Sequence, residues 1–221
     1  MPGLKKYFPD VRFGANKVTP DEIDWRIRYT VTKPSAGTAG VGTLAAGTVA
    51  GTLDLLSTQN DYPRNLLYTV VGPSGGVGGT FAVTGTDQFG VSKTESLTIA
   101  SANAGGTAAG TQIFDTVSTI TYNPNGVDNT STTTVGYAIG TASGLVGKLG
   151  LPVKIKAVGD VKRLTWIKNG TYTPIQAGTI GTLVVDTTNH AFRGTAVMAA
   201  TDEWVVEIRP TYNYENDTNT V

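Results

Sequence analysis

The stretch that decides the fold runs from Pro63 to Tyr122 and reads PRNLLYTVVGPSGGVGGTFAVTGTDQFGVSKTESLTIASANAGGTAAGTQIFDTVSTITY. Between clusters of Gly, Pro, Ser and Asp, its apolar residues fall at every second position. That pattern is typical of half-buried antiparallel strands joined by tight turns. Four strands are expected, and their buried faces carry Leu66, Tyr68 and Val70, then Phe81 and Val83, then Leu97 and Ile99, and finally Ile113, Val117 and Ile120. The sequence therefore predicts an all-β fold.

Two local features refine this expectation. The segment GTDQFG (85–90) has Gly at both ends and predicts a hairpin loop between the second and third strands. In the fourth strand the alternation slips by one residue, either between Ile113 and Val117 or between Val117 and Ile120. A β-bulge would produce such a slip.

The chain before this stretch begins with residues 1–24, which contain three prolines and no sustained period. They are expected to form an extended arm. The arm is either a loose terminus or a segment that docks apolar side chains on a neighbouring subunit, and its candidate contact residues are Leu4, Tyr7, Phe8 and Phe13. Residues 25–31 alternate between apolar and polar side chains and predict a strand.

Two glycine-rich segments could suggest catalytic or nucleotide sites. The spacing Gly37-x-x-Gly40-x-Gly42 lies in a segment that is either a linker or a thin pair of strands with closely approaching backbones. A dinucleotide site needs an amphipathic helix after the glycines, and no helical period follows. The spacing Gly72-x-Ser74-x-Gly76 matches a nucleophile elbow, but β-type sequence follows it, so a hairpin connection is favoured.

After Tyr122, a run of short strands is expected, with turn signals between them. The predicted segments are 135–139, 153–157 and 161–166 on either side of Gly159-Asp160, a hairpin at Asn169-Gly170, then 183–186, 191–199 and 204–209. The predicted organisation is an extended arm (1–24), an antiparallel β-sandwich of the immunoglobulin-like type (25–147) and a smaller C-terminal β portion with a polar tail (148–221).

The amino-acid composition limits the kinds of partner and of metal site that we expect for this chain. The 17 basic and 17 acidic residues give a formal net charge of zero, so neither nucleic acid nor an anionic membrane is an expected partner. Only 15% of residues are charged, which suits a surface that is buried in an assembly. The absence of cysteine excludes disulfides and thiolate metal sites. No signal peptide is visible, so we expect the chain to be made in a cytoplasm.

Catalysis has little support in the sequence. The single histidine, His190, lies in what reads as a turn between strands, where a capping or surface role is favoured over that of a base. One His and no Cys exclude the usual zinc ligand sets, and no Asp-x-Asp-x-Asp-Gly loop occurs. Asp202 and Glu203 read as charges at the start of a strand. We therefore expect no catalytic residue, no metal and no cofactor.

A resemblance to a known group of proteins rests on five short motifs. In order they are Pro63-Arg64-Asn65, the segment GTDQFG (85–90), Glu95, Phe114-x-x-Val117-x-x-Ile120 and the segment KLGLP (148–152). This order resembles that of structural proteins of tailed-bacteriophage virions. The resemblance covers residues 60–155, so the arm and the C-terminal portion lie outside it.

The resemblance implies a structural, non-enzymatic component of the virion. The favoured form is a capsid decoration (cement) protein that binds the outer surface of the head. Its implied partners are the major capsid protein and neighbouring copies of itself, in a homo-oligomer for which a trimer is the suggested state. The alternative is a tail or fibre module that recognises host-surface carbohydrate. Sugar stacking would use Trp25, Trp166, Tyr172 and Trp204, although their place on apolar strand faces favours core packing.

Overall fold

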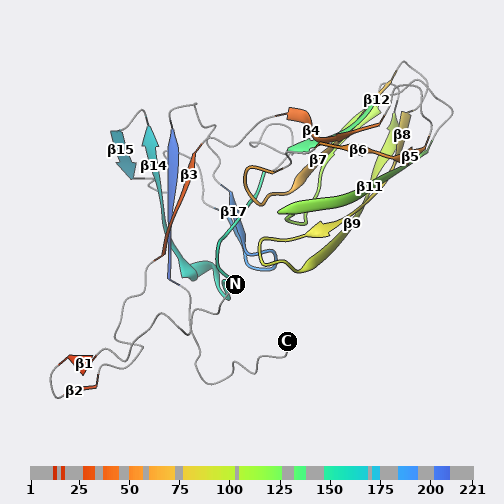
Figure 1. Cartoon of the computed structure of the whole chain (residues 1–221). Helices are drawn as coiled ribbons and strands as arrows, with labels where there is room; N and C mark the ends of the chain where they lie inside the picture. Colours follow the sequence, from red (N-terminus) through yellow and green to blue (C-terminus); the bar gives the residue numbers. More distant parts are fainter. Residues whose placement is uncertain are drawn as a thin grey trace.

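The computed structural model describes residues 12–13, 16–17, 27–32, 37–44, 50–56, 60–72, 77–102, 105–125, 132–137, 147–168, 171–174, 184–193 and 202–209. Within these ranges the protein is all-β and every strand pair is antiparallel (Figure 1). The only helical element in them is the 3-10 turn η4 (Val158–Asp160). The all-β prediction is confirmed.

The strands form several small sheets, arranged in the orders β1-β2, β10-β7-β12-β4-β6, β5-β11-β8-β9, β13-β17-β16 and β15-β14-β18-β3. Their bounds are β1 Arg12–Phe13, β2 Asn16–Lys17, β3 Ile27–Thr32, β4 Gly37–Thr43, β5 Gly51–Thr52, β6 Asp54–Leu55, β7 Leu66–Val71, β8 Val77–Thr86, β9 Ser92–Ala102, β10 Gly105–Ala109, β11 Thr116–Pro124, β12 Thr132–Tyr137, β13 Leu149–Gly150, β14 Val161–Lys168, β15 Thr171–Pro174, β16 Val184–Asp186, β17 Ala191–Arg193 and β18 Glu203–Ile208.

The first core lies between the five-stranded sheet β10-β7-β12-β4-β6 and the four-stranded sheet β5-β11-β8-β9. The alternating apolar residues of the deciding stretch fill it, as the sequence predicts. Its buried side chains include Leu66, Tyr68, Val70, Phe81, Val83, Ile99, Val117, Ile120 and Tyr122, and Leu97 packs against them. Phe81 is central, with its ring centroid 5.1 Å from that of Tyr68 and 4.9 Å from that of Tyr122.

The hairpin and the bulge are both confirmed. Strands β8 and β9 pair across the loop at Asp87, with Thr86 opposite Ser92. Asp87 shapes this loop because its Oδ1 accepts the backbone N–H groups of Phe89 (2.9 Å) and Val91 (3.0 Å). The register of β11 against β8 shifts between Val117 and Thr119, which is the second of the two predicted places. Ile113 is buried but precedes the strand.

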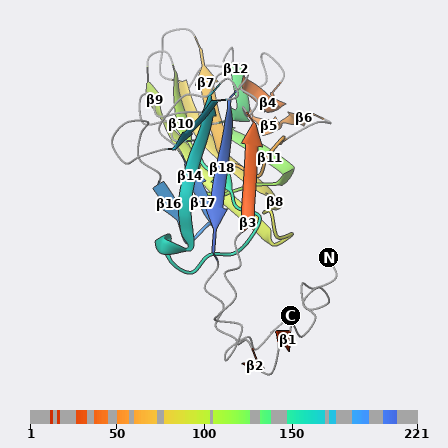
Figure 2. The ribbon, with the colours of Figure 1, turned by 90° about the vertical axis from the view of Figure 1, so that its left-hand side faces the viewer.

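The second core lies between the sheets β13-β17-β16 and β15-β14-β18-β3. We call the two sheets around the first core the first unit and these two sheets the second unit. The second unit lies beside the first in Figure 1 and in front of it in Figure 2. It contains Val31, Leu149, Leu151, Ile155, Val161, Leu164, Phe192, Trp204, Val206 and Ile208. Strands at 161–168, 184–186, 191–193 and 203–208 agree with the predicted segments. The hairpin expected at Asn169-Gly170 agrees with the pairing of Lys168 with Thr171, although these two turn residues lie outside the described ranges.

Strand β3 does not belong where the predicted division at residue 147 puts it. It pairs along its whole length with β18, from Ile27 opposite Ile208 to Thr32 opposite Glu203. Residues 27–32 therefore complete the C-terminal sheet instead of the first unit. Alternation identified the strand correctly, but it contains no information on which sheet edge the strand joins.

The strand expected at 153–157 is absent, and this prediction is wrong. The segment folds around two side chains that take its backbone N–H groups. Asp160 Oδ2 accepts from Lys156 N (2.8 Å) and Ala157 N (3.1 Å), and His190 Nδ1 lies 3.3 Å from Ile155 N. Since side chains satisfy these donors, the segment needs no neighbouring strand.

The glycine-rich segment 37–43 is strand β4, and close packing explains its glycines. The ring of Tyr137 lies where a Cβ at Gly40 would be, and the Tyr137 hydroxyl donates to Gly40 O at 2.9 Å. A Cβ at Gly42 would lie 3.1 Å from Asp54 O on β6. The spacing thus allows close approach between strands.

A truncation of Phe81 tests the first core. Phe81 is 0% exposed and packs between two tyrosine rings, so Phe81→Ala should lower the free energy of unfolding by about 3–5 kcal/mol. Urea denaturation measures this loss. Thr84→Ala on the exposed side of the same strand is the control and should change stability by less than ~0.5 kcal/mol. Equal effects of the two changes would contradict the assigned facing of β8.

Candidate functional site

The outer face of the sheet β5-β11-β8-β9 has no charged side chain among its described residues. We call twelve of its residues the hydroxyl face: Thr80, Ala82, Thr84, Thr86, Ser92, Thr94, Ser96, Thr98, Thr116, Thr119, Thr121 and Asn123. Thr80 and Thr86 are half-buried, and the other ten are exposed. Because their strand neighbours point into the first core, these residues all point away from it.

The hydroxyl face is regular. Pairing across β11, β8 and β9 places its residues in four rows: Thr116-Thr86-Ser92, Thr119-Thr84-Thr94, Thr121-Ala82-Ser96 and Asn123-Thr80-Thr98. Neighbours within a row are about 4.8 Å apart, and rows are about 6.8 Å apart. In the last row the hydroxyl oxygens of Thr80 and Thr98 are hydrogen-bonded at 2.9 Å. The face is therefore an ordered, neutral array of small side chains.

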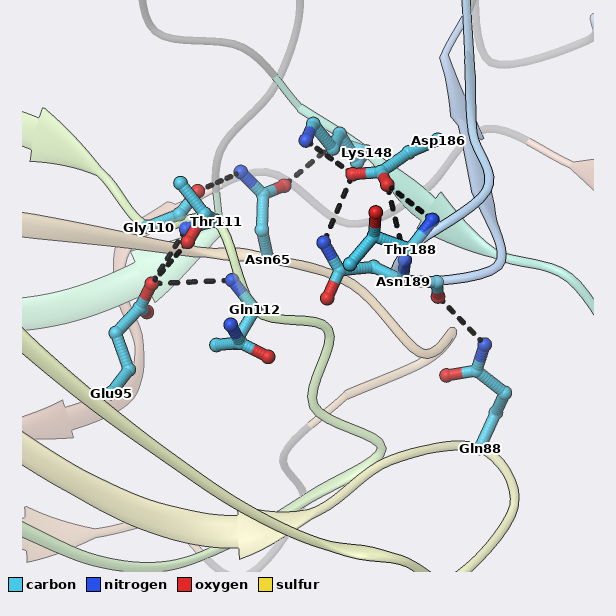
Figure 3. A network of polar contacts seen from close by, with 10 residues as sticks. All are labelled: Asn65, Gln88, Glu95, Gly110, Thr111, Gln112, Lys148, Asp186, Thr188 and Asn189. Carbon is cyan, nitrogen blue, oxygen red and sulfur yellow. Dashed lines mark hydrogen bonds and ion pairs between the residues drawn. The ribbon is translucent and has the colours of Figure 1, made fainter.

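The first unit meets the second elsewhere, through side chains that include Arg64, Asn65 and Gln88. We call this meeting region the junction and define it by Pro63, Arg64, Asn65, Gln88, Lys148, Gly150, Asp186, Asn189 and His190. It is made largely of backbone groups that side chains satisfy. Figure 3 shows most of its polar contacts.

Arg64 and Asn65 hold the centre of the junction. Arg64 is 1% exposed, forms β-bridges to Phe114 and Leu149, and places its guanidinium carbon 4.4 Å from the Tyr137 ring centroid. Its Nη1 lies 2.8 Å from Asp61 Oδ1. Burial lowers the pKa of Arg64, and the Asp61 carboxylate opposes that shift. A buried cation with a carboxylate and an aromatic ring as partners is a structural anchor.

Asn65 joins the two units with both ends of its amide (Figure 3). Its Nδ2 donates to Gly110 O at 2.8 Å, and its Oδ1 accepts from Lys148 N at 2.7 Å. Next to it, Gly150 N donates to Pro63 O at 2.7 Å. A Cβ at Gly150 would lie 2.9 Å from Pro63 Cβ, which explains the glycine.

Glu95 closes one end of the first unit. Its Oε1 accepts from Thr111 N (2.6 Å) and Gln112 N (3.2 Å), and its Oε2 accepts from the Tyr68 hydroxyl at 2.8 Å. Burial raises the pKa of Tyr68, and Glu95 raises it further. Glu95 is therefore fully engaged as a structural acceptor.

Asp186 organises the turn between β16 and β17. Its carboxylate accepts from Lys148 Nζ (2.6 Å), Asn189 N (3.0 Å), Asn189 Nδ2 (3.0 Å) and Thr188 N (3.1 Å). Partial burial raises the pKa of Asp186, but the hydrogen bonds from Asn189 and Lys148 and the Lys148 charge outweigh burial and lower it to about 2.

His190 is a junction residue. Its backbone has φ of +48°, a left-handed conformation that ends the turn. Its ring packs edge-on against Phe89 with centroids 5.6 Å apart, while Gln88 Nε2 donates to His190 O at 3.2 Å. Burial lowers the pKa of His190. The predicted capping role agrees with this environment.

The other predicted site residues fall in three groups. Leu4, Tyr7 and Phe8 lie outside the described residues, and Phe13 belongs to β1, which pairs with β2. Ser74, Trp25 and the side chains of Trp166 and Tyr172 are also outside them. Trp204 is 6% exposed and packs in the second core, with its ring centroid 6.2 Å from that of Phe192. For Trp204, the favoured core role is confirmed.

The described residues contain no group of three or more His, Asp or Glu side chains that could hold a metal ion. Nor do they include a helix long and apolar enough to cross a membrane. No family model, no curated protein and no solved structure matches this chain. The function proposed below rests on the hydroxyl face and the junction.

Sequence reasoning missed both features. The signal for the hydroxyl face was present, because Thr and Ser occupy the positions between the buried residues of three strands. The motifs at 63–65, 85–90 and 148–152 contain junction residues, but the sequence does not show that they meet, since contacting residues such as Gln88 and His190 are more than a hundred positions apart.

Removal of the Asn65 amide tests the junction. Asn65→Ala leaves Gly110 O and Lys148 N without their side-chain partner, so the free energy of unfolding should fall by about 2–4 kcal/mol. Chemical denaturation measures the change, and Asn125→Ala at an exposed position is the matched control. A loss below ~0.5 kcal/mol would contradict the role given to Asn65.

Asp186 should make stability depend on acid pH. Its folded-state pKa of about 2 lies below the ordinary value of 3.8, so ionised Asp186 stabilises the fold above about pH 4. That contribution is lost as the pH falls toward 2. Denaturation between pH 2 and 6 should show a shallower slope for Asp186→Asn than for the unaltered chain. Asp54→Asn at an exposed position controls for net charge, and an unchanged slope in Asp186→Asn would argue against the lowered pKa.

Proposed function

We propose that this protein is a structural component of a tailed-bacteriophage virion, and that it acts as a decoration protein on the outer surface of the capsid. In this role it binds the major capsid protein and neighbouring copies of itself, without catalysis and without a cofactor. It is made in the host cytoplasm and resides in the virion. We also assign the first unit to the immunoglobulin-like β-sandwiches and residues 1–24 to an extended attachment arm.

The hydroxyl face is the observation that supports this proposal most directly. Surface charge keeps a freely diffusing protein soluble, so a neutral, regular surface of small side chains offers a free enzyme no advantage. In an assembly the same surface can be covered without the cost of desolvating charges. Weak contacts of this kind gain strength when symmetry repeats them over a particle.

The junction supports the proposal in a second way. Arg64, Asn65 and Asp186 satisfy backbone and side-chain groups of the protein itself, and each has several partners. Such polar groups hold elements in fixed positions and leave little chemistry available for a substrate. A cement protein needs this property, because it must keep its shape while bridging other subunits.

The motifs behind the phage resemblance also contribute. Pro63-Arg64-Asn65, Gln88 and residues 148–150 take part in the contacts of the junction, and Glu95 accepts from the backbone of Gln112 in the first unit. Residues 63–65, Gln88 and residues 148–150 contact one another in space, so these motifs belong to one connected architectural unit. The carbohydrate alternative has less support, because Trp204 is buried and the hydroxyl face has no aromatic residue.

Binding to phage heads tests the proposed function. Purified chain should co-sediment with expanded heads of the phage that encodes it, and should raise the temperature at which those heads release DNA. Deletion of residues 2–20 should weaken binding because it removes the arm. Unchanged occupancy after deletion would remove the arm from the proposal, whereas binding to a glycan array without binding to heads would favour the carbohydrate alternative.

A further inference from the structure

We propose that the hydroxyl face is a contact between two copies of this chain, which pack their β5-β11-β8-β9 sheets face to face. The inference rests on the proposed function, in that it names the surface and the partner of one assembly contact. It can fail without the proposed function failing. It concerns the isolated protein, whereas the function concerns its binding to heads.

Charge is the first argument for this partner. The face carries no formal charge on its described residues. Lys93 and Glu95 of strand β9 point to the other side of the sheet, toward Asp87 and Tyr68 respectively. A charged partner would lose water from its charges and find no counter-charge here. A second copy offers an equally neutral surface, so the two faces match in charge.

Hydrogen bonding is the second argument. Ten of the twelve positions are Thr or Ser, whose hydroxyl both donates and accepts. The 2.9 Å bond between Thr80 and Thr98 shows that neighbouring hydroxyls on this face can satisfy each other. A two-fold axis places the face against itself, and hydroxyls can pair with hydroxyls in that arrangement. Small side chains also let two sheets approach closely.

The area of the face sets the expected strength. Three strands and four rows cover on the order of 400 Å², from the strand spacing and rise. A standard interface buries about 800 Å² per partner, so this contact alone supports a weak dimer, micromolar or weaker. Such a contact is sufficient where other contacts in a particle hold both copies nearby. It can pair two protomers or join two larger oligomers.

Other occupants fit the face less well. The rows contain no aromatic side chain that could stack on a sugar or a base. They contain one amide, that of Asn123, which lies in the last row. Nucleic acid would also require basic residues, which are absent from the described residues of this face. A neutral polysaccharide is thus an outcome of the test and not the occupant proposed.

The absence of cysteine from the natural chain allows a direct test. Thr84→Cys and Ser96→Cys each place one thiol in one of the two middle rows of the face, and Thr107→Cys places one at an exposed position of β10 in the other sheet as a matched control. Under mild oxidation, the two face variants should form disulfide-linked dimers at least tenfold faster than the control. Equal rates for all three variants would overturn the proposal.

A second measurement uses charge. Sedimentation velocity over a series that reaches ~1 mM should show dimerisation of the unaltered chain. The double variant Thr84→Lys/Ser96→Lys should weaken it at least tenfold, because like charges would meet across the axis. Thr107→Lys should have no effect, and urea denaturation checks that each variant is folded. A monomeric natural chain at every concentration, or a dimer insensitive to the double change, contradicts the inference.

The two experiments also separate the inference from the function. If the protein binds heads but does not self-associate through this face, only the inference is refuted. If the protein dimerises through this face but does not bind heads, the decoration role is refuted and the proposed contact between copies is supported. Binding of a neutral polysaccharide that the lysine variants abolish, without dimerisation, would replace the second copy as occupant.

Discussion

The structure depends on one requirement, that Asn65 satisfy a backbone donor in one unit and a backbone acceptor in the other at the same time. Its amide bonds Gly110 O at 2.8 Å and Lys148 N at 2.7 Å while the residue is 1% exposed. Arg64 beside it bridges Phe114 and Leu149. Buried backbone groups must be paired, so these two residues determine where the second core begins relative to the first.

Among the described residues, this arrangement keeps charged groups away from the outer face of the sheet β5-β11-β8-β9. Two ion pairs lie at or beside the junction, Arg64 with Asp61 and Lys148 with Asp186. The sheet β5-β11-β8-β9 is then left with an outer face of hydroxyls and methyls. A neutral face on a rigid body is suited to packing, because its shape is fixed and its desolvation is inexpensive.

Alternation of apolar residues was sufficient to predict the first core, the hairpin at Asp87 and the bulge near Val117, since each depends on neighbours in sequence. It was insufficient for β3, whose partner β18 lies far along the chain. It also failed at 153–157, where Asp160 and His190 take the backbone donors that a strand would have used. Side-chain acceptors from a distant turn cannot be inferred from a periodic pattern.

The residues of the resemblance motifs also make contacts between distant segments of the chain. Pro63, Asn65, Gln88, Glu95 and Lys148 are engaged with other parts of this chain, and none of them lies on the hydroxyl face. A pattern made of such residues describes how two units are joined. It gives no information on the exposed sheet, because that surface is built from threonine and serine positions outside most of the pattern. The contacts that join the two units and the exposed faces are therefore separate features of this chain, and the motifs describe only the first.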